Sequence, residues 1–356
     1  MLSQARPQLS VVIPTLNEAE HLPGLLDDLR KQQDIAIEII IGDGGSEDAT
    51  RSVAEVYGAR FVSCGRGRGT QMNAAAALAS HEMFLFLHAD TRLDDPALLG
   101  NAVRAMTNGQ RRYDRVAGHF PLRFIRAATH NVMAYRYTEE KTAFNRENTT
   151  NGDQGLLLTK GFFTSIGGFD ERMPFLEDQR IAEKIRSEGS WITLPGHVST
   201  SARRFEAEGF HRRYILMSMM MGLHSIGVGD FFVRAPGVYQ TQQDTGRLLL
   251  SPFFTLVWHM ILKEWGLFGT ARIFYSLGRY IRRNSWQMFY FADIWLRPLL
   301  GCGRYPCLKF HDRVFAPCTA FKVLDVVTGV LSFVWFMGVL SPYFWLVDRC
   351  KLKNKG

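Results

Sequence analysis

The stretch Ser10-Val-Val-Ile-Pro-Thr-Leu-Asn-Glu18 opens the part of the chain whose pattern decides the fold. Its β-branched start is typical of a buried strand, and a helical pattern with leucines on one face follows from Glu18 to about Gln33. The alternation then repeats, with strands expected at 37–41, 61–62 and 83–87 and helices at 48–57 and around 74–79. Strands that alternate with helices predict an α/β fold with a doubly wound, mainly parallel central sheet.

Polar or glycine-rich segments follow all four expected strands. They are Pro14–Glu18, Asp43–Thr50, Gly65–Asn73 and His88–Thr91. In an open parallel sheet, ligands bind beyond the carboxyl ends of the strands, so the four segments predict one crevice for a charged, hydroxyl-rich ligand. A single acid such as Asp48 is equally explained as the N-cap of the next helix. The 65–73 loop is a poor dinucleotide-binding fingerprint, because it follows the third strand and carries arginines between its glycines.

Charge and aromatic content divide the 356-residue chain into two parts. The whole chain has 42 Lys and Arg against 34 Asp and Glu, but residues 245–356 hold fifteen of the bases and only five of the acids. The tail is therefore +10 and residues 1–244 are −2, and six of the seven tryptophans lie in the tail. A mean hydropathy of −0.08 excludes a protein built mostly of membrane-spanning helices. Five cysteines are too few for a disulfide framework.

Three motifs of the first part resemble those of glycosyltransferase family 2, which has the GT-A fold. They are Ser10–Glu18, the Asp-Gly-Gly-Ser-x-Asp-x-Thr run at 43–50 and His-x-Asp at 88–90. The segments 65–73, 152–155, 167–170 and 175–178 are similar to a bacterial subgroup associated with radical-SAM and selenium-metabolism genes. The resemblance implies a GT-A (nucleotide-diphospho-sugar transferase) catalytic domain at 1–244, which moves a sugar from a nucleoside diphosphate to an acceptor hydroxyl or phosphate. Nothing in it covers residues 245–356, which we expect to form a mostly helical, basic extension.

The resemblance implies that strand ends and the glycine-arginine loop hold the nucleotide sugar. The residues concerned are Pro14, Asn17, Glu18, Asp43, Gly65, Arg66, Arg68, Gln71, His88, Asp90 and Arg204. Carboxylate and amide oxygens can accept hydrogen bonds from ribose hydroxyls and a base N–H, and a guanidinium can bind a diphosphate with two donors. Arg204-Phe205 stands where many relatives have Arg-Trp, and Ser201 stands where they have Gln. These departures disfavour processive polymer synthesis.

His88 and Asp90 are the expected metal site, where the family usually has two aspartates. Alternate residues of a strand share a face, so both side chains are expected to point into the crevice. The resemblance makes Asp90 a ligand of Mn²⁺ or Mg²⁺, with His88 as a further ligand or a nearby ribose contact. Imidazole is accepted by Mn²⁺, whereas Mg²⁺ prefers oxygen. From the residues alone, Asp90 is also a candidate cap for the helix that begins near residues 94–96.

Glu177-Asp178 precedes an amphipathic helical pattern. Two acids at a helix start are commonly partners of the helix dipole. The resemblance instead makes Asp178 the catalytic base that takes the acceptor proton, with Glu177 as the fallback, in a single displacement that inverts the anomeric centre. Asp153 and Gln154 are expected on the acceptor side.

Two functions of other classes compete with sugar transfer. A nucleotide-binding regulatory or scaffold protein would keep the crevice without turnover, but the presence of Asp43, Asp90 and Asp178 together argues against it. A nucleotidyltransferase would share the sheet and the metal, and analysis of the products would separate it from a glycosyltransferase.

The tail contains an uncharged stretch at 326–347 that is long enough to span a bilayer. A span would place Arg and Lys of the tail outside the cell, against the positive-inside rule, whereas a monotopic arrangement keeps them with anionic lipids on the cytosolic face. We therefore expect interfacial or re-entrant helices on the cytoplasmic side of the inner membrane and an acceptor that can be lipid-linked, with no nucleic-acid partner. A span and a soluble aromatic-rich subdomain stay open as alternatives.

Three cysteines and a histidine lie close together in the tail, at Cys302, Cys307, His311 and Cys318. Three thiolates and an imidazole can close a tetrahedral zinc site. The spacing lacks a C-x2-C pair, and buried free cysteines are common, so ordinary packing is the alternative.

Overall fold

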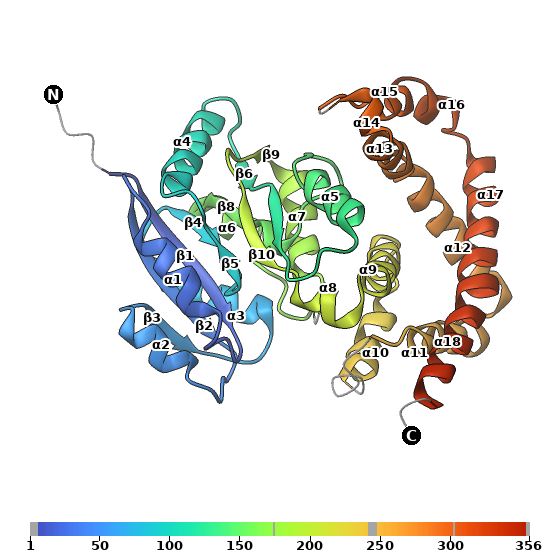
Figure 1. The fold of residues 1–356 in the computed structure, drawn as a ribbon, viewed down its shortest axis with the longest axis horizontal. Helices are drawn as coiled ribbons and strands as arrows, with labels where there is room; N and C mark the ends of the chain where they lie inside the picture. Colours follow the sequence, from blue (N-terminus) through green and yellow to red (C-terminus); the bar gives the residue numbers. More distant parts are fainter. Residues whose placement is uncertain (1–5, 174, 241–247, 302, 354–356) are drawn as a thin grey trace. The chain divides into compact units, whose positions relative to one another are not determined.

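Two compact units make up the chain, Met1–Ala202 and Arg203–Gly356. The computed structural model, shown as a ribbon in Figure 1, describes residues 6–173, 175–240, 248–301 and 303–353. The units divide earlier in the chain than the compositional boundary at residue 244. The extent of a catalytic domain over 1–244 stays a prediction.

The first unit is an α/β structure built on a seven-stranded sheet. Its strand order is β3-β2-β1-β4-β8-β6-β9, and only β8 runs antiparallel to its neighbours. The strands are β1 (Gln8–Thr15), β2 (Ala36–Asp43), β3 (Arg60–Ser63), β4 (Met83–Phe86), β6 (Val116–His119), β8 (Leu156–Thr159) and β9 (Ser190–Thr193). All four predicted strands are present, and the mainly parallel sheet is confirmed.

Helices and a small second sheet complete this unit. The second sheet has the order β5-β10-β7, with β5 (Thr91–Arg92), β7 (Leu122–Ile125) and β10 (Val198–Ser201). The helices are α1 (Leu22–Arg30), α2 (Thr50–Val56), α3 (Arg68–Ala77), α4 (Leu98–Gln110), α5 (Val132–Lys141), the 3-10 turn η1 (Gly152–Gln154), α6 (Lys160–Ser165) and α7 (Glu177–Glu188).

The central sheet is buried on both faces because its strands alternate apolar side chains between two cores. Leu9, Val11 and Ile13 of β1 pack with leucines of α1 and α4. Val12 points to the other face, where it meets Ile40 and the apolar side chains of α3, α6 and α7. This packing fixes the carboxyl ends of β1, β2 and β4 side by side.

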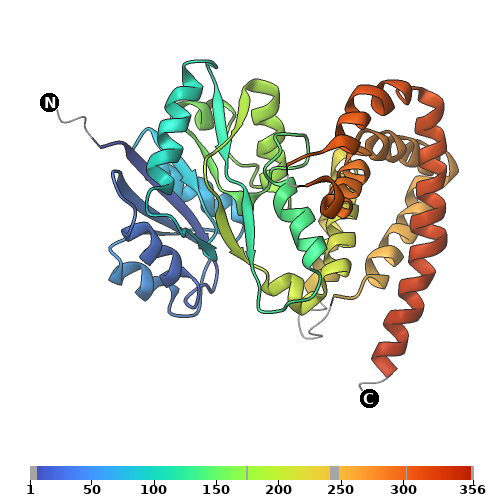
Figure 2. The same ribbon diagram turned by 45° about the horizontal axis from the view of Figure 1, so that its top comes forward.

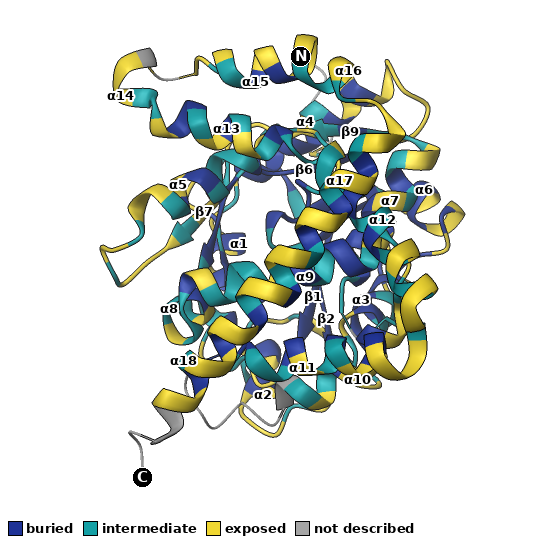
Figure 3. Cartoon of the chain, turned by 90° about the vertical axis from the view of Figure 1, so that its right-hand side faces the viewer, coloured by how far each residue is buried: buried dark blue, intermediate teal, exposed yellow. Residues whose placement is uncertain are grey.

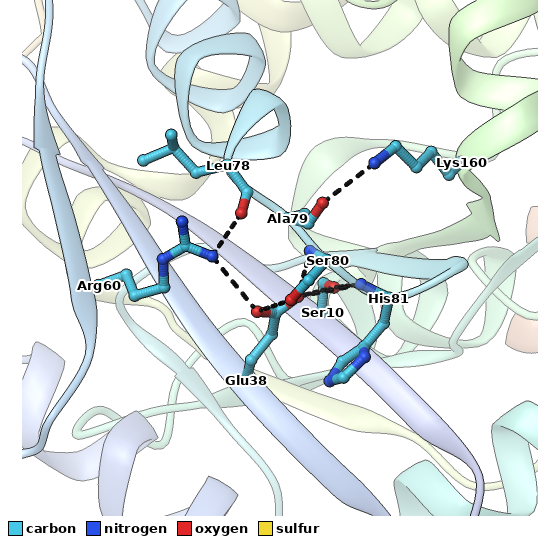
Figure 4. A network of polar contacts seen from close by, with 8 residues as sticks. All are labelled: Ser10, Glu38, Arg60, Leu78, Ala79, Ser80, His81 and Lys160. Atoms are coloured by element: carbon cyan, nitrogen blue, oxygen red, sulfur yellow. Dashed lines mark hydrogen bonds and ion pairs between the residues drawn. The ribbon is translucent and has the colours of Figure 1, made fainter.

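A half-buried carboxylate joins the amino-terminal ends of neighbouring strands of this sheet (Figure 4). Glu38 of β2 accepts hydrogen bonds from the hydroxyls of Ser10 and Ser80 and from the backbone N–H of Ser80 and His81. Arg60 of β3 lies 3.6 Å from the same carboxylate. Burial alone would raise the pKa of Glu38, but the hydrogen bonds outweigh it and lower the pKa to about 2.

The second unit is helical over its described residues, as predicted for the tail. Its helices include α8 (Arg203–Glu208), α9 (Phe210–Ser225), α10 (Gly229–Gln240), α11 (Ser251–Met260), η3 (Ile261–Trp265), α12 (Gly266–Arg283), α13 (Trp286–Trp295), α14 (Arg297–Leu300), α15 (Pro306–Phe310), η4 (His311–Phe315), α16 (Ala316–Cys318), α17 (Lys322–Phe333), η5 (Val334–Leu340) and α18 (Ser341–Lys353). In Figure 2 the last three form one long rod, drawn in red.

Helices α12 and α17 approach closely enough that only glycine fits at their crossing. A Cβ on Gly278 would lie 2.2 Å from the backbone oxygen of Asp325, and a Cβ on Gly329 would lie 2.5 Å from that of Phe274. The ring of Phe274 packs edge-on against Phe333. Residues 251–283 therefore pair antiparallel with residues 322–353.

The zinc-site alternative for the cysteines and histidine of the tail is not assembled by the residues that the structure describes. Cys302 lies outside them. The backbone N–H of Cys307 donates to Asp293, and the ring of His311 hydrogen-bonds Ser285 and Asp312. Among the described residues, no three His, Cys, Asp or Glu side chains are arranged to hold a metal ion. The hydrogen bonds of His311 are those of a packed core residue, 4% exposed.

We expect Glu38→Gln to lower the free energy of unfolding of the chain by about 1–3 kcal/mol at pH 7, because an amide cannot accept all these hydrogen bonds. The lowered pKa stabilises the fold above the ordinary glutamate pKa, near 4.5, and this contribution is lost as the pH falls toward 2. The variant should thus lose less stability than wild type between these pH values. Urea denaturation followed by circular dichroism measures both quantities. Glu20→Gln, at an 88% exposed side chain, is the matched control, and an equal effect of both variants would contradict the assignment.

Candidate active site

The ends of β1 and β2 are joined by side chains that hydrogen-bond across the two loops. Asn17 adopts a left-handed backbone conformation, with φ of 55°. Its backbone N–H donates to the hydroxyl of Ser46, and its side-chain oxygen accepts from the N–H of Glu47. This geometry places Pro14, Asn17 and Glu18 beside the 43–48 loop, as the strand-end argument predicts.

Asp43 is the centre of the 43–48 loop and is 3% exposed. One oxygen accepts from the hydroxyls of Thr15 and Ser46, and the other accepts from the backbone N–H of Gly45 and Ser46. Burial favours the neutral acid, but these hydrogen bonds hold the pKa of Asp43 below its ordinary value. The carboxylate is therefore ionised and shapes the loop. The contact of Asp43 with a nucleotide, which the family resemblance implies, remains a prediction.

Two other polar residues of these loops have structural hydrogen bonds. The carboxylate of Asp48 accepts from the backbone N–H of Ala19 and of Thr50, the first residue of α2, whereas the N-cap residue of this helix is Ala49. Gln71 of α3 is buried, and its amide donates to the carbonyl of Thr15. The approach is so close that a Cβ on Gly42 would lie 2.1 Å from the backbone oxygen of Gln71.

His88 and Asp90 lie beyond the end of β4, which stops at Phe86. They occupy a turn closed by the hydrogen bond from the N–H of Thr91 to the carbonyl of His88, so strand alternation is not what places them. Nδ1 of His88 lies 2.8 Å from a carboxylate oxygen of Asp153. The imidazole is thus oriented by an acid that the sequence predicted for the acceptor side.

The 3-10 turn η1 carries this acid into the site. Asn151 and Gln154 form a reciprocal cap, in which each side chain accepts from a backbone N–H at the other end of the turn. Gln154 is 0% exposed, and its amide also donates to the carbonyls of Phe120 and Thr142. It supports the turn from behind, and its predicted place on the acceptor side stays a prediction.

Gly152 lies between His88 and Asp178 and approaches both side chains closely. A Cβ at this position would lie 2.9 Å from Nε2 of His88 and 3.5 Å from Cβ of Asp178. The backbone N–H of Gly152 donates to one oxygen of Asp178 at 2.7 Å, and the N–H of Gln179 donates to the other at 2.8 Å. Gly152 was visible in the sequence as part of a motif, but its role in joining two site residues appears only in the fold.

Helix α7 begins with Glu177 and Asp178 after Leu176, which has a left-handed φ of 62°. That conformation is costly for a branched residue and is found where the fold fixes a functional side chain. No signal in the sequence marks Leu176. Glu177 is 3% exposed and its carboxylate lies 3.2 Å from the guanidinium of Arg68. Burial, more than the charge of Asp178, raises the pKa of Glu177.

Arg68, in the first turn of α3, is the cation of this cluster. Desolvation lowers its pKa, but the carboxylates of Glu177, Asp153 and Asp178 outweigh this and raise it. Three acids around one arginine leave excess negative charge in this cluster. A small cavity lies beside His88, Thr150 and Asp178 and is otherwise lined mostly by apolar side chains such as Phe169 and Trp191.

The segments that resemble the bacterial subgroup meet at this cluster. Asn73, in the helix that follows the glycine-arginine loop, donates to the carbonyl of Phe169 and accepts from its N–H, Arg68 binds Glu177, and Gly152 binds Asp178. Gly65 and Arg66 of the loop are exposed. Arg204 belongs to α8 of the second unit. Its contact with the nucleotide sugar remains a prediction.

Comparison with known proteins matches this unit to one family. Residues 10–160 match the model of glycosyl transferase family 2. The PGL/p-HBAD biosynthesis glycosyltransferase of Mycobacterium bovis (strain BCG / Pasteur 1173P2) is 28% identical over 201 residues, which cover 54% of this chain and 75% of that protein. The dolichyl-phosphate beta-glucosyltransferase ALG5A of Trichomonas vaginalis is 28% identical over 151 residues, 35% of this chain and 47% of that protein.

The structure of Staphylococcus aureus TarS 1-349 in complex with UDP aligns with 93% of this chain and 92% of that chain, at a TM-score of 0.47 and 15% identity. The family match lies within the unit that holds the parallel sheet, the strand-end loops and the His88–Asp178 cluster. Residues 10–160 match the glycosyltransferase family 2 model, and the first unit has a GT-A-like α/β fold.

Proposed function

We propose that the chain is an inverting, metal-dependent glycosyltransferase that moves a sugar from a nucleoside-diphosphate sugar to an acceptor hydroxyl or phosphate. The observation that carries the proposal is the cluster of Asp178, Gly152, His88 and Arg68 in the unit that contains the family 2 match. Two relatives that each match part of the chain carry the names of glycosyltransferases.

Asp178 is the proposed base. Both its oxygens accept a backbone N–H, from Gly152 and Gln179, which fixes the carboxylate and leaves lone pairs for an acceptor proton. Glu177 is the weaker candidate, because it is buried against Arg68. In the proposed step the acceptor oxygen attacks the anomeric carbon as its proton passes to Asp178, and the bond from that carbon to the diphosphate breaks.

Arg68 and the strand-end loops are the proposed donor site. The side chain of Arg68 is 43% exposed, and its guanidinium would exchange its contact with Glu177 for a phosphate oxygen. Asn17, Glu18 and Asp43 line the neighbouring loops, where a nucleoside would bind.

Asp90 fits a divalent cation by the chemistry of its donor atoms. Mg²⁺ and Mn²⁺ are commonly held by one or two protein carboxylates together with substrate phosphates, which does not require three side chains from the protein. Asp90 would hold the ion and His88, oriented by Asp153, would lie beside it. When bound, the ion would supply a Lewis acid for the charge that develops on the diphosphate.

We further propose action at the cytosolic face of the membrane on an acceptor that can be lipid-linked. Support comes from the basic, aromatic tail and from one relative's name, a dolichyl-phosphate glucosyltransferase. Membership of the radical-SAM-associated bacterial subgroup is likewise a proposal, supported by the meeting of its four segments at one cluster.

Asp178→Asn should lower kcat for sugar transfer by about 10²–10⁴-fold, because the amide cannot take the acceptor proton. The dissociation constant for the nucleoside diphosphate should change less than threefold, since Asp178 is assigned no contact with it. Steady-state kinetics and calorimetry measure the two. Glu183→Gln, on the exposed face of the same helix, is the control. Wild-type kcat in Asp178→Asn would show that another group is the base.

Asp90→Ala should abolish the dependence of nucleotide-sugar binding on Mn²⁺ while the fold, followed by circular dichroism, stays intact. Calorimetric titration of UDP-glucose, UDP-GlcNAc and GDP-mannose with and without Mn²⁺ measures this. Asp114→Ala, at an exposed position of the same unit, should behave like wild type. If Mn²⁺ strengthens binding equally in wild type and Asp90→Ala, the metal assignment is wrong.

A further inference from the structure

The long helix formed by α17, η5 and α18 has its polar residues turned inward and its apolar residues turned outward. The inward face consists of Asp325, Gly329, Ser332, Met337, Ser341, Phe344 and Asp348, all buried. The outward face carries large apolar side chains that are 43–72% exposed: Val323, Val326, Val327, Val330, Leu331, Val334, Trp335, Val339, Tyr343, Trp345 and Leu346. Figure 3 shows this exposed face along α17.

The inward acids stand at the two ends of the uncharged stretch and are each neutralised within the unit. Asp325 lies 2.5 Å from Arg282 and 3.6 Å from Arg279 of α12. Asp348 lies 2.6 Å from Arg212 of α9, and it accepts the backbone N–H of Leu250 and Ser251 at the start of α11. Both ends of the helix are therefore bound to the same compact unit.

A helix that packs on the core of a soluble protein turns its apolar side chains inward and its polar side chains outward. This helix does the opposite. Each exposed valine or leucine leaves in water area whose burial would gain about 25 cal/mol per Å², and contiguous exposed patches of this kind mark a binding surface. In lipid, by contrast, polar side chains face the protein and pair with one another. By length and hydropathy Lys322–Cys350 could cross a membrane, and only 22% of its apolar window is buried.

The charge of the unit selects an anionic partner. Asp293, Asp325 and Asp348 are 1–2% exposed, so three of the five acids of the tail are hidden inside it. Exposed cations remain on the two antiparallel helical segments and on the residues that connect them, among them Arg272, Arg283, Arg304, Lys309, Arg313, Lys322 and Arg349. Anionic headgroups are attracted to such a surface by about 1 kcal/mol for each base near them.

We propose that this outward face lies in one leaflet of an anionic bilayer and that the helix, here called the lipid-facing helix, does not cross the bilayer. Residues 284–321 join α12 to α17 and contain Arg297, Arg304, Lys309 and Arg313 against Asp293 and Asp312. Crossing would carry this basic segment to the far side, which the positive-inside rule disfavours. The antiparallel partner of the helix also has charged residues, Lys263 and Glu264, within its length. This deepens the membrane placement proposed above, and its test needs no sugar transfer.

The lipid partner is tested with Val330→Glu in the full chain, by flotation with phosphatidylcholine vesicles that contain 0% or 30% phosphatidylglycerol. Wild type should float with the anionic vesicles, and Val330→Glu should bind them at least tenfold more weakly. Val56→Glu, at a 76% exposed valine of the first unit, is the matched control and should bind like wild type. Equal binding of all three proteins would overturn the proposal. So would a lipid-free dimer that Val330→Glu dissociates, because the occupant of the face would then be a second copy of the chain.

The single-leaflet arrangement is tested by labelling Arg304→Cys in a chain whose five native cysteines are replaced by serine. A membrane-impermeant maleimide should label this position in inside-out vesicles, as it labels Arg111→Cys of the first unit. Labelling only from the opposite side would show a span. Labelling only after detergent would show that the connecting segment is embedded, and either outcome contradicts the arrangement.

Discussion

The close approach at Gly152 is the constraint on which the candidate active site depends. One backbone N–H fixes an oxygen of Asp178, and the missing side chain leaves room for His88 on the other side. The residue of the turn that passes between these two side chains must lack a Cβ. The position of the turn is set by the buried amide of Gln154. The ion pair of Arg68 and Glu177 completes the cluster at the start of α7, directly after Leu176 in its left-handed conformation.

The placement of this cluster could be predicted in part from the sequence. Short apolar runs such as Val11-Val12-Ile13, alternating with helices and followed by polar strand ends, predicted the parallel sheet and its polar edge, because burial on both faces and strand-end chemistry are local signals. The contact of His88 with Asp153 could not be predicted, since it joins residues 65 positions apart across a turn whose path depends on packing. For Asp43, the residue type predicted the loop, whereas its four hydrogen bonds to the loop itself became visible only in three dimensions.

For the tail, too, composition predicted some features, and only the structure showed others. Its charge and tryptophans predicted a helical, basic extension, and residues 326–347 predicted an apolar helix. Composition could not show that the acids bordering this stretch, Asp325 and Asp348, both face inward against arginines. That orientation results from the crossing of α12 and α17 at Gly278 and Gly329, which brings Arg282 to Asp325.

The central claim is a single displacement at the anomeric carbon, and the anomeric configuration of the first-formed product tests it most directly. Wild type would be incubated with α-linked nucleoside-diphosphate sugars and Mn²⁺, with water or an added acceptor, and the product followed by proton NMR before it mutarotates. The account predicts a β-configured product from an α-configured donor. An α-configured product, or no turnover of any nucleoside-diphosphate sugar, would contradict it.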